Sequence, residues 1–472
     1  MLRRAMLRFA KDRKANVAII FALMMVPTVF LLGMALDYTL ALRKKAQLDA
    51  AADAAAVAAV RPAMLTQTDN SVVQATAAAV FAAKANVPGL QSVPTPTVNV
   101  VDSGLQRTIT VSYTAQSMNN FPGVLGQQTW QINGTSTARA SSAPNMNFYL
   151  LLDDSPSMAI AATQNDITNL IAYTKNQPSG SANCGFACHE LHPNLDSGAS
   201  STTKDNLAIA RANNVTLRID LVANAVKQLL VGPWTCPQSG VSGGVMQCMS
   251  ALNNTTYKAA IYTFDYNLNT IQTLTTPTTA GTQISNIQLL TVDHQNCVTT
   301  TPSSLCGTDF GTDISGALAG VNAVMPLPGT GTNQSGDTPQ EVVFLVTDGL
   351  EDKLISSSTG CNALATLSLQ KLGSSYRCQQ SLDTTTCTTI KNRGIRIAIL
   401  YTEYLELPTN GWYNQQIAQY NNPSSSTGQI AQRLQSCASP GLFADVQTGG
   451  DISAALTNLF IKVASSTASL MQ

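Results

Sequence analysis

The sequence predicts an α/β protein: an N-terminal transmembrane helix, a small α+β region next to the membrane, and then a doubly wound, mostly parallel sheet. Three observations predict this arrangement. An uncharged apolar segment runs from Ala15 to Leu36. Three stretches between residues 95 and 140 alternate well enough to be strands of a small antiparallel sheet. From Met146 onward, strand-like runs alternate with helix-like runs, which is typical of a parallel sheet covered by helices on both faces.

The apolar segment is long enough to cross a bilayer, because as a helix it would span roughly 33 Å. Six basic residues precede it and three follow it, so we expect the N-terminus in the cytoplasm and the chain after Asp37 outside it. A cleaved signal peptide is the alternative. Its apolar core would be unusually long, and basic residues follow where a small-residue cleavage site is expected. The segment is therefore interpreted as an uncleaved, single-pass anchor.

The rest of the chain divides at changes of composition. The alanine-rich stretch from Gln47 to Val60 is expected to be helical, and it either packs closely against another helix or forms a solvated stalk. Ser141 to Asn145 is interpreted as a hinge. The expected parts are a cytoplasmic basic tail (1–14), a transmembrane helix (15–36), a juxtamembrane alanine-rich helix (37–62), a small helix with antiparallel strands (63–143) and the large sheet domain (144–472) with insertions near 175–215, 232–256, 291–311 and 349–386.

The large domain is expected to contain five strands and at least three helices. Its strands are apolar runs and its helices are longer stretches between them. The expected strands are Met146–Leu152, Tyr257–Phe264, Glu341–Thr347, Ile395–Thr402 and Gly441–Val446, and the expected helices are Leu217–Leu230, Ile314–Val324 and Asp451–Ala464.

Polar side chains stand where two of these strands end. Asp153, Ser155 and Ser157 follow the first strand, and Asp348 follows the strand that ends at Thr347. Thr312 comes directly after a glycine and just before a helix. Ligands of such sheets bind beyond the carboxyl ends of the strands. Carboxylate and hydroxyl oxygens converging there suit a small hard cation such as Mg²⁺.

These pieces, D-x-S-x-S, G-T and T-D-G in that order, resemble the metal-ion-dependent adhesion site of the von Willebrand factor A domain. The resemblance covers the chain from about Met146 to its end. It implies that Ser155, Ser157 and Thr312 touch Mg²⁺ or Mn²⁺, while Asp153 and Asp348 act mostly through water. Such a cation takes a carboxylate from a protein partner as its last ligand. A turn that caps the following helix would explain the first piece alone without a metal, whereas the ordered set favours a metal.

The N-terminal stretch RKANVAIIFALMMVPTVFLLGMALDYTLALRKKAQLDAAADAAAVAA resembles TadE/TadG-like proteins of the Flp pilus (tight adherence) system. The features that carry the resemblance are an Asn before the apolar run, Pro27, Gly33, Asp37, a basic patch and the alanine-rich run. Prepilin-type processing is not expected, because Gly33 lies late in the apolar run. The TadG-like arrangement implies an inner-membrane protein of a Gram-negative bacterium, with a periplasmic domain that binds a pilus or envelope component.

Other classes of protein fit the sequence less well. The charges balance, 27 basic against 27 acidic, so no nucleic-acid footprint is indicated. A phosphatase of the D-x-D type needs a carboxylate where Ser155 stands, and all three histidines lie in the insertions rather than at strand ends. No phosphate-binding loop of the form GxxxxGK[ST] is present. We therefore expect neither an enzyme nor a small-molecule substrate.

All ten cysteines lie beyond Asn183, which favours disulfides in an oxidising compartment. Cys387 and Cys437 are expected to pair, because both precede strands and right-handed crossovers put their helices on one face of the sheet. Disulfides in the insertions are expected to shape the surface that a partner meets. The expected local pairs are Cys184–Cys188, Cys236–Cys248, Cys297–Cys306 and Cys361–Cys378.

Two alternatives stay open. The stretch CGFACHELH, from Cys184 to His192, suggests a periplasmic redox or c-type haem protein, although haem attachment requires two residues between the cysteines and here there are three. A zinc site in this stretch is disfavoured, because residues so close in sequence rarely complete a tetrahedron alone. The other alternative is an adhesin that leaves the inner membrane and reaches the cell surface.

Overall fold

The computed structural model describes residues 15–178, 181–237, 240–294, 311–361, 369–372, 374–403, 413–421, 430–447 and 449–465. The chain divides into two compact units, the first ending at Ser142 and the second beginning at Ala143. Each unit has its own apolar core, so we describe them separately.

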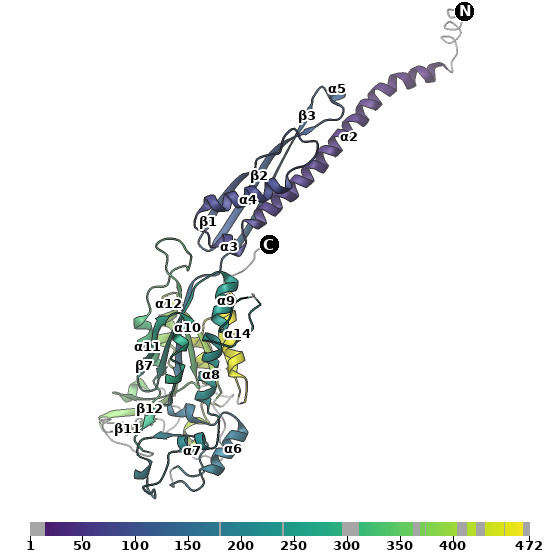
Figure 1. The fold of residues 1–472 in the computed structure, drawn as a ribbon. Coiled ribbons are helices and arrows are strands. Elements are labelled where there is room, and N and C mark those ends of the chain that lie inside the picture. The colour runs from purple at the N-terminus through teal and green to yellow at the C-terminus, as the bar shows by residue number, and fades with distance from the viewer. Residues whose placement is uncertain are drawn as a thin grey trace, which may run out of the picture. The chain divides into compact units, whose positions relative to one another are not determined.

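The first unit is built on one long helix, α2 (Ala15–Ala58), which joins the predicted anchor and the alanine-rich helix without a break (Figure 1). Its 44 residues correspond to a length of about 66 Å. Between Val17 and Leu36 most of its side chains are exposed, and nearly all of them are apolar. Within the described residues, α2 is the one helix long and apolar enough to cross a membrane. This supports the predicted single-pass anchor.

The second half of α2 lies on a three-stranded antiparallel sheet with the order β1-β2-β3. Alanines on one side of α2 are buried against the sheet and α4, together with Leu48, Phe81 and Ile109. The small side chains allow this close packing, so the interpretation as a solvated stalk is wrong. The unit's other elements are α3 (Pro62–Leu65), α4 (Asn70–Lys84), β1 (Thr97–Ser103), β2 (Gln106–Met118), α5 (Pro122–Leu125) and β3 (Thr129–Ser141).

The second unit is organised around a six-stranded sheet, and the predicted α/β class is confirmed. Its order is β14-β13-β9-β4-β6-β7, and all neighbours are parallel except the hairpin pair β6-β7. From β4 the chain adds β6 and β7 on one side of the sheet, and it then adds β9, β13 and β14 on the other side. The strand order therefore reverses between β4 and β9. The strands are β4 (Met146–Asp153), β6 (Tyr257–Phe264), β7 (Leu268–Thr275), β9 (Gln340–Thr347), β13 (Arg396–Thr402) and β14 (Phe443–Val446).

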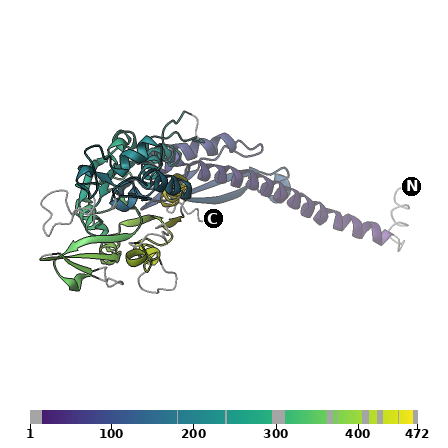
Figure 2. The ribbon, with the colours of Figure 1, turned by 90° about the horizontal axis from the view of Figure 1, so that it is seen from below.

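Helices cover both faces of this sheet (Figures 1 and 2). Because every residue of β4 is buried, its alternate side chains enter two different cores: Phe148 and Leu150 on one face, Tyr149 and Leu151 on the other. The first face packs against α8 (Arg218–Leu230), α9 (Val245–Asn253), α10 (Pro277–Gly281) and α14 (Ile452–Ser465), and the second against α11 (Ile314–Val324), α12 (Thr385–Asn392) and α13 (Ile430–Cys437).

The insertions contain regular structure that the sequence did not indicate. One is a three-stranded antiparallel sheet, β10-β12-β11, which follows β9 and is drawn in green in Figure 2. Another places the two-residue strands β5 and β8 side by side. Their elements are α6 (Gln164–Tyr173), β5 (His189–Glu190), α7 (Asn206–Ala212), β8 (Thr291–Val292), β10 (Leu350–Ile355), β11 (Leu369–Leu372) and β12 (Ser375–Ser381).

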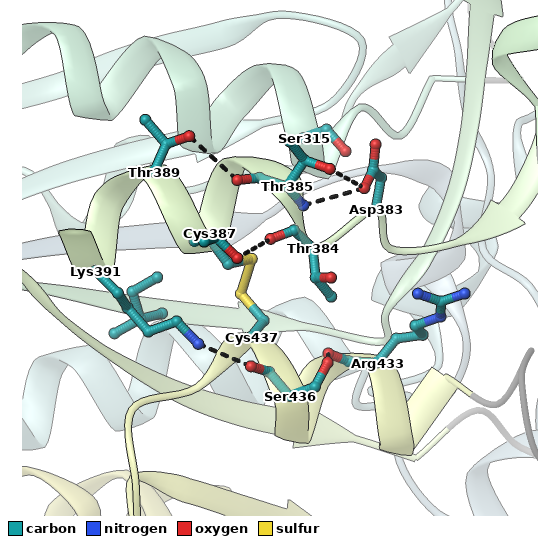
Figure 3. Close-up of a disulfide and its surroundings, with 12 residues drawn as sticks. Ser315, Asp383, Thr384, Thr385, Cys387, Thr389, Lys391, Arg433, Ser436 and Cys437 are labelled. Carbon is teal, nitrogen blue, oxygen red and sulfur yellow. Dashed lines mark hydrogen bonds between the residues drawn. A yellow bond between two sulfur atoms is a disulfide. The ribbon is translucent and has the colours of Figure 1, made fainter.

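Three of the predicted disulfides are present: Cys236–Cys248, Cys361–Cys378 and Cys387–Cys437. The third joins α12 to α13 on one face of the sheet, as predicted, and the Lys391 ammonium nearby donates to the Ser436 carbonyl at 2.8 Å (Figure 3). The predicted pair of Cys297 and Cys306 lies outside the described residues.

The predicted Cys184–Cys188 disulfide is wrong, because the two cysteines are not joined. The segment between them pairs with residues 159–161 through an antiparallel bridge at Ile160 and Phe186. Four residues of extended chain separate Cα atoms by about 13 Å. A disulfide needs Cα atoms within about 7 Å.

Candidate metal centre

Asp153 is the last residue of β4 and is fully buried. Just beyond it, the chain turns sharply into a short 3₁₀ helix that begins at Pro156. The turn is held by the Ser155 N–H, which donates to Asp153 Oδ1 at 3.1 Å, and the Ser155 and Ser157 hydroxyl oxygens lie 3.0 Å apart. The structure therefore brings together the three polar residues of the D-x-S-x-S stretch.

Asp348 follows β9, the strand beside β4, and is also fully buried. The two strand ends are joined by Thr347, whose hydroxyl donates to Asp153 Oδ2 at 2.6 Å and accepts from the Gly349 N–H at 2.9 Å. Gly349 has φ +82°, and a Cβ there would come within 2.4 Å of Ile430. Only glycine therefore suits the turn that follows Asp348.

Thr312 lies on the other side of this edge, two residues before α11, and is buried. Its N–H donates to the Asp352 carbonyl and its carbonyl accepts from the Asp352 N–H, both at 2.9 Å. The N–H of the next residue, Asp313, donates to the Asp265 carbonyl just after β6. These backbone pairs hold Thr312 between β6 and the start of β10.

The two buried aspartates are electrostatically unfavourable as they stand. Burial raises the pKa of Asp153, and the charge of Asp348 raises it further. Burial also raises the pKa of Asp348, although Arg218 partly opposes the rise. Neither carboxylate oxygen of Asp348 makes a well-formed hydrogen bond among the described residues, although the nearby Ser157 hydroxyl and Leu350 N–H lower its pKa. Such oxygens normally carry a partner, because leaving them without one costs free energy.

A divalent cation resolves this imbalance. It would neutralise both aspartates at once and occupy the lone pairs of Asp348. The residues present therefore fit the predicted Mg²⁺ or Mn²⁺, which prefer oxygen ligands. Their position also fits, because β4 and β9 are the strands between which the strand order reverses, where ligands of such sheets bind.

The sequence analysis did not predict the group of buried polar residues that contacts Thr312 and the start of α11. Glu351 is fully buried and accepts hydrogen bonds from the Ser315 N–H at 2.8 Å and from Gln380 at 2.7 Å. Asp352 accepts two hydrogen bonds from the Arg377 guanidinium, at 2.8 and 2.5 Å. These contacts tie β10 and β12 to the beginning of α11. The available signal was the run Glu-Asp-Lys, which begins one residue after T-D-G.

Asp154, next to the predicted ligand Asp153, was also missed. Burial raises its pKa to about 8, and its Oδ1 has no hydrogen-bond partner in the described part of the chain. Its N–H donates to the Phe264 carbonyl and its carbonyl accepts from the Leu290 N–H. The backbone of Asp154 thus joins β4 to β6 and to the segment that leads to β8.

In the CGFACH stretch, the two cysteines are not joined and the histidine pairs with an aspartate. Burial raises the pKa of the Cys184 thiol, and its sulfur accepts a hydrogen bond from the Phe186 N–H. Nδ1 of His189 lies 2.9 Å from Asp205 Oδ2. Among the residues that the structure describes, no group of three or more His, Cys, Asp or Glu side chains is arranged to hold a metal ion.

Residues 15–63 match the model of a protein family described as putative Flp pilus-assembly TadE/G-like. This match confirms the resemblance predicted for the N-terminus. No curated protein sequence matches the chain.

Solved structures resemble the chain at low identity. One is the vWF domain of the type V pili tip protein Mfa5 from Porphyromonas gingivalis, at 9% identity and TM-score 0.33, covering 70% of this chain and 99% of that one. Another is the PilB minor pilin from Streptococcus sanguinis, at 11% identity and TM-score 0.33, covering 79% and 78%. A third is proximal thread matrix protein 1 from the mussel byssus, with a zinc-occupied MIDAS motif, at 12% identity and TM-score 0.28, covering 69% and 48%.

The chain thus joins two parts of different kinds. The first unit begins with the segment that matches the family model. The second unit has the doubly wound sheet expected from the resemblance to von Willebrand factor A domains. The chain therefore carries an N-terminal segment that matches the model described as putative Flp pilus-assembly TadE/G-like, and this segment is followed by an α/β domain with a doubly wound sheet.

Proposed function

We propose that this protein works in Flp pilus assembly by binding a protein partner through a divalent cation at the edge of its second unit. Asp153, Ser155, Ser157, Thr312 and Asp348 hold the cation, which is Mg²⁺ or Mn²⁺. The observation that carries the proposal is the pair of fully buried aspartates, Asp153 and Asp348, at the ends of two neighbouring strands, with no well-formed hydrogen bond to the Asp348 oxygens among the described residues.

The ligand set suits recognition rather than catalysis. Three of the five residues offer neutral hydroxyl oxygens, so the bound cation stays electrophilic and accepts a carboxylate from a partner. Ser157 is partly exposed while Asp153, Ser155 and Asp348 are buried, so a partner reaches the site from the side of Ser157. The partner is a pilus or envelope component that offers an acidic side chain. Neither a nucleic acid nor a small-molecule substrate is part of this function, and the protein is not an enzyme.

The proposed location is the inner membrane, with the second unit in the periplasm. The basic residues before the apolar segment favour a cytoplasmic N-terminus. Three disulfides in the second unit support an oxidising compartment. A surface adhesin is the alternative location, and fractionation of the cell envelope distinguishes the two.

The redox or haem alternative has less support. A reactive cysteine needs a lowered pKa and access to solvent. Burial instead raises the pKa of Cys184. Haem staining of the purified protein tests this alternative directly, and a stained band would favour it.

Cross-linking in the producing cell tests the proposed function. Tagged full-length protein is cross-linked in Mg²⁺ or after EDTA, and the attached pilus and envelope components are identified by mass spectrometry. A specific component should be recovered with the wild type but not with Asp348→Asn or after EDTA. The matched control is Asp451→Asn, because Asp451 is an exposed aspartate that caps α14 and an Asn can also cap a helix. Equal recovery with all three proteins would contradict the proposal.

A further inference from the structure

The apolar segment of α2 ends at a buried carboxylate that binds another part of the first unit. Asp37 is 2% exposed. Its Oδ1 accepts from the Asn120 N–H at 2.8 Å, and its Oδ2 accepts from the Phe121 N–H at 3.1 Å. Asn120 and Phe121 belong to the tip of the β2–β3 hairpin, which we define as residues 118–130. The two hydrogen bonds therefore hold the hairpin tip at the level of α2 where the apolar segment stops.

Around this contact, large apolar side chains are exposed. Phe121 and Trp130 come from the hairpin tip, and Tyr38 and Leu42 from α2; their exposed fractions lie between 36% and 49%. The Tyr38 and Trp130 rings meet edge to face, with centroids 5.9 Å apart. The helix and the hairpin thus contribute to one exposed patch, which we call the aromatic collar: Tyr38, Leu42, Phe121 and Trp130.

With the apolar segment of α2 as the membrane span, the collar would begin in the lipid headgroup layer and end at its outer edge. Leu42 is six residues beyond Leu36, so the collar extends about 9 Å past the end of the apolar segment. The interfacial layer on each side of the hydrocarbon core is about 5–8 Å thick. Just beyond the collar, the Lys44 ammonium donates to the Gly89 and Met118 carbonyls, while the neighbouring Arg43 is exposed. Arg43 can therefore meet lipid phosphates.

We propose that the hairpin tip is a second membrane contact, lying in the headgroup layer of the same bilayer that α2 crosses. Tyr and Trp are the residues that favour this layer, because their rings are apolar at one end and polar at the other. The occupant of the collar is the lipid interface, because the collar begins directly after the exposed apolar surface of α2. The proposal rests on α2 as the membrane anchor. Two contacts with the bilayer fix the rotation of α2 about its axis, which the helix alone does not.

Fluorescence quenching by brominated lipids tests the proposal. The full-length protein with Trp234→Phe and Trp412→Phe has Trp130 as its one tryptophan, since the chain has three. It is reconstituted into vesicles whose lipids carry bromine near the headgroup or near the end of the acyl chain. Trp130 fluorescence should be quenched, and more strongly by the shallow bromine.

The matched control moves the tryptophan to Val101, with Trp130→Phe and Val101→Trp in the same background. Val101 is 51% exposed on β1. It lies near Arg107, whose guanidinium binds the Gln67 carbonyl beyond the C-terminal end of α2. A tryptophan at Val101 should not be quenched. Trp130 without quenching, or equal quenching at both positions, would overturn the proposal.

Two further measurements test whether the protein is anchored in the vesicles and whether the substitutions affect the result. Flotation shows whether the protein is anchored at all, and a protein that does not float would remove the anchor and the proposal together. A photoactivatable headgroup lipid, used with the unmodified protein, avoids any effect of the substitutions on folding. Its cross-links should fall within residues 118–130 and not at the β1–β2 turn, Ser103–Gln106. The reverse distribution would refute the second membrane contact.

Discussion

The Thr347 hydroxyl donates a hydrogen bond to Asp153 Oδ2 at 2.6 Å and so joins the ends of two neighbouring strands, β9 and β4. Thr347 of the T-D-G stretch therefore holds the carboxylate of Asp153 at the end of β4. The next residue, Asp348, lies just beyond the end of the neighbouring strand β9. Both aspartates are fully buried. The position of the Asp153 carboxylate therefore depends on Thr347, the residue that precedes Asp348.

Replacing Thr347 with valine should destabilise the second unit. The change keeps the shape of the side chain but removes a donor to Asp153 and an acceptor for the Gly349 N–H. Leaving buried groups without partners costs about 1–3 kcal/mol each. Because two groups are affected, denaturant unfolding of the metal-free protein should show a loss of at least about 2 kcal/mol.

Thr457→Val is the matched control for this loss. Thr457 is also a buried threonine, but its hydroxyl has no hydrogen-bond partner among the described residues. Its replacement should be neutral or slightly stabilising. Equal losses in Thr347→Val and Thr457→Val would show that the hydrogen bond to Asp153 has no special role.

Glu351→Ala should weaken metal binding although Glu351 is not a proposed ligand. Its carboxylate holds the start of α11 through the Ser315 N–H, and its neighbour Asp352 pairs with the Thr312 backbone. Calorimetric titration with Mn²⁺ should give a lower affinity for Glu351→Ala than for Glu351→Gln, whose side-chain carbonyl still accepts from Ser315. An unchanged affinity in Glu351→Ala would mean that Thr312 is positioned without this contact.

Removing the Cys387–Cys437 disulfide should cost more stability than removing Cys236–Cys248. The two pairs close loops with sequence separations of 50 and 12 residues. In the chain-entropy model this difference amounts to about 1 kcal/mol. Paired serine substitutions and denaturant unfolding measure it, and the opposite order would show that contacts in the native state outweigh loop entropy.

A reporter enzyme that is active only in the periplasm should be active when fused after Arg61. The prediction follows from the six basic residues before the apolar segment against three after it. A reporter that is active only in the cytoplasm serves as the reciprocal control. Cytoplasmic activity at this position would reverse the topology and remove the basis for an oxidising compartment.

The strands at the centre of the sheet could be predicted from the sequence because they are buried on both faces. Every residue of β4 and all but the first of β9 are buried, so the centre of each strand appears as an unbroken apolar run, Phe148–Leu152 and Val342–Val346. The edge strand β7 was missed because it is only half-buried and five of its eight residues are polar. A central strand that is buried on both faces can therefore be predicted from local sequence far better than a half-exposed strand at the edge of the sheet.

The candidate site could be predicted in part for the same reason. Asp153 and Asp348 end apolar runs, so their place at one edge follows from the parallel order of the strands. The role of Glu351 could not be predicted, because a charged residue is buried only when distant partners satisfy it, here Ser315 and Gln380. The missing Cys184–Cys188 disulfide has a similar cause, since pairing with residues 159–161 keeps the segment extended.

Binding of Mn²⁺, followed by the electron paramagnetic resonance signal of the free ion, tests the central claim most directly. Full-length wild type and Asp451→Asn should each remove one equivalent of Mn²⁺ from solution, and added Mg²⁺ should release it. Asp348→Asn should remove none while keeping its fold, because Asp348 lies just beyond a strand end and its oxygens make no well-formed hydrogen bond among the described residues. Equal Mn²⁺ binding by wild type and Asp348→Asn would contradict the account.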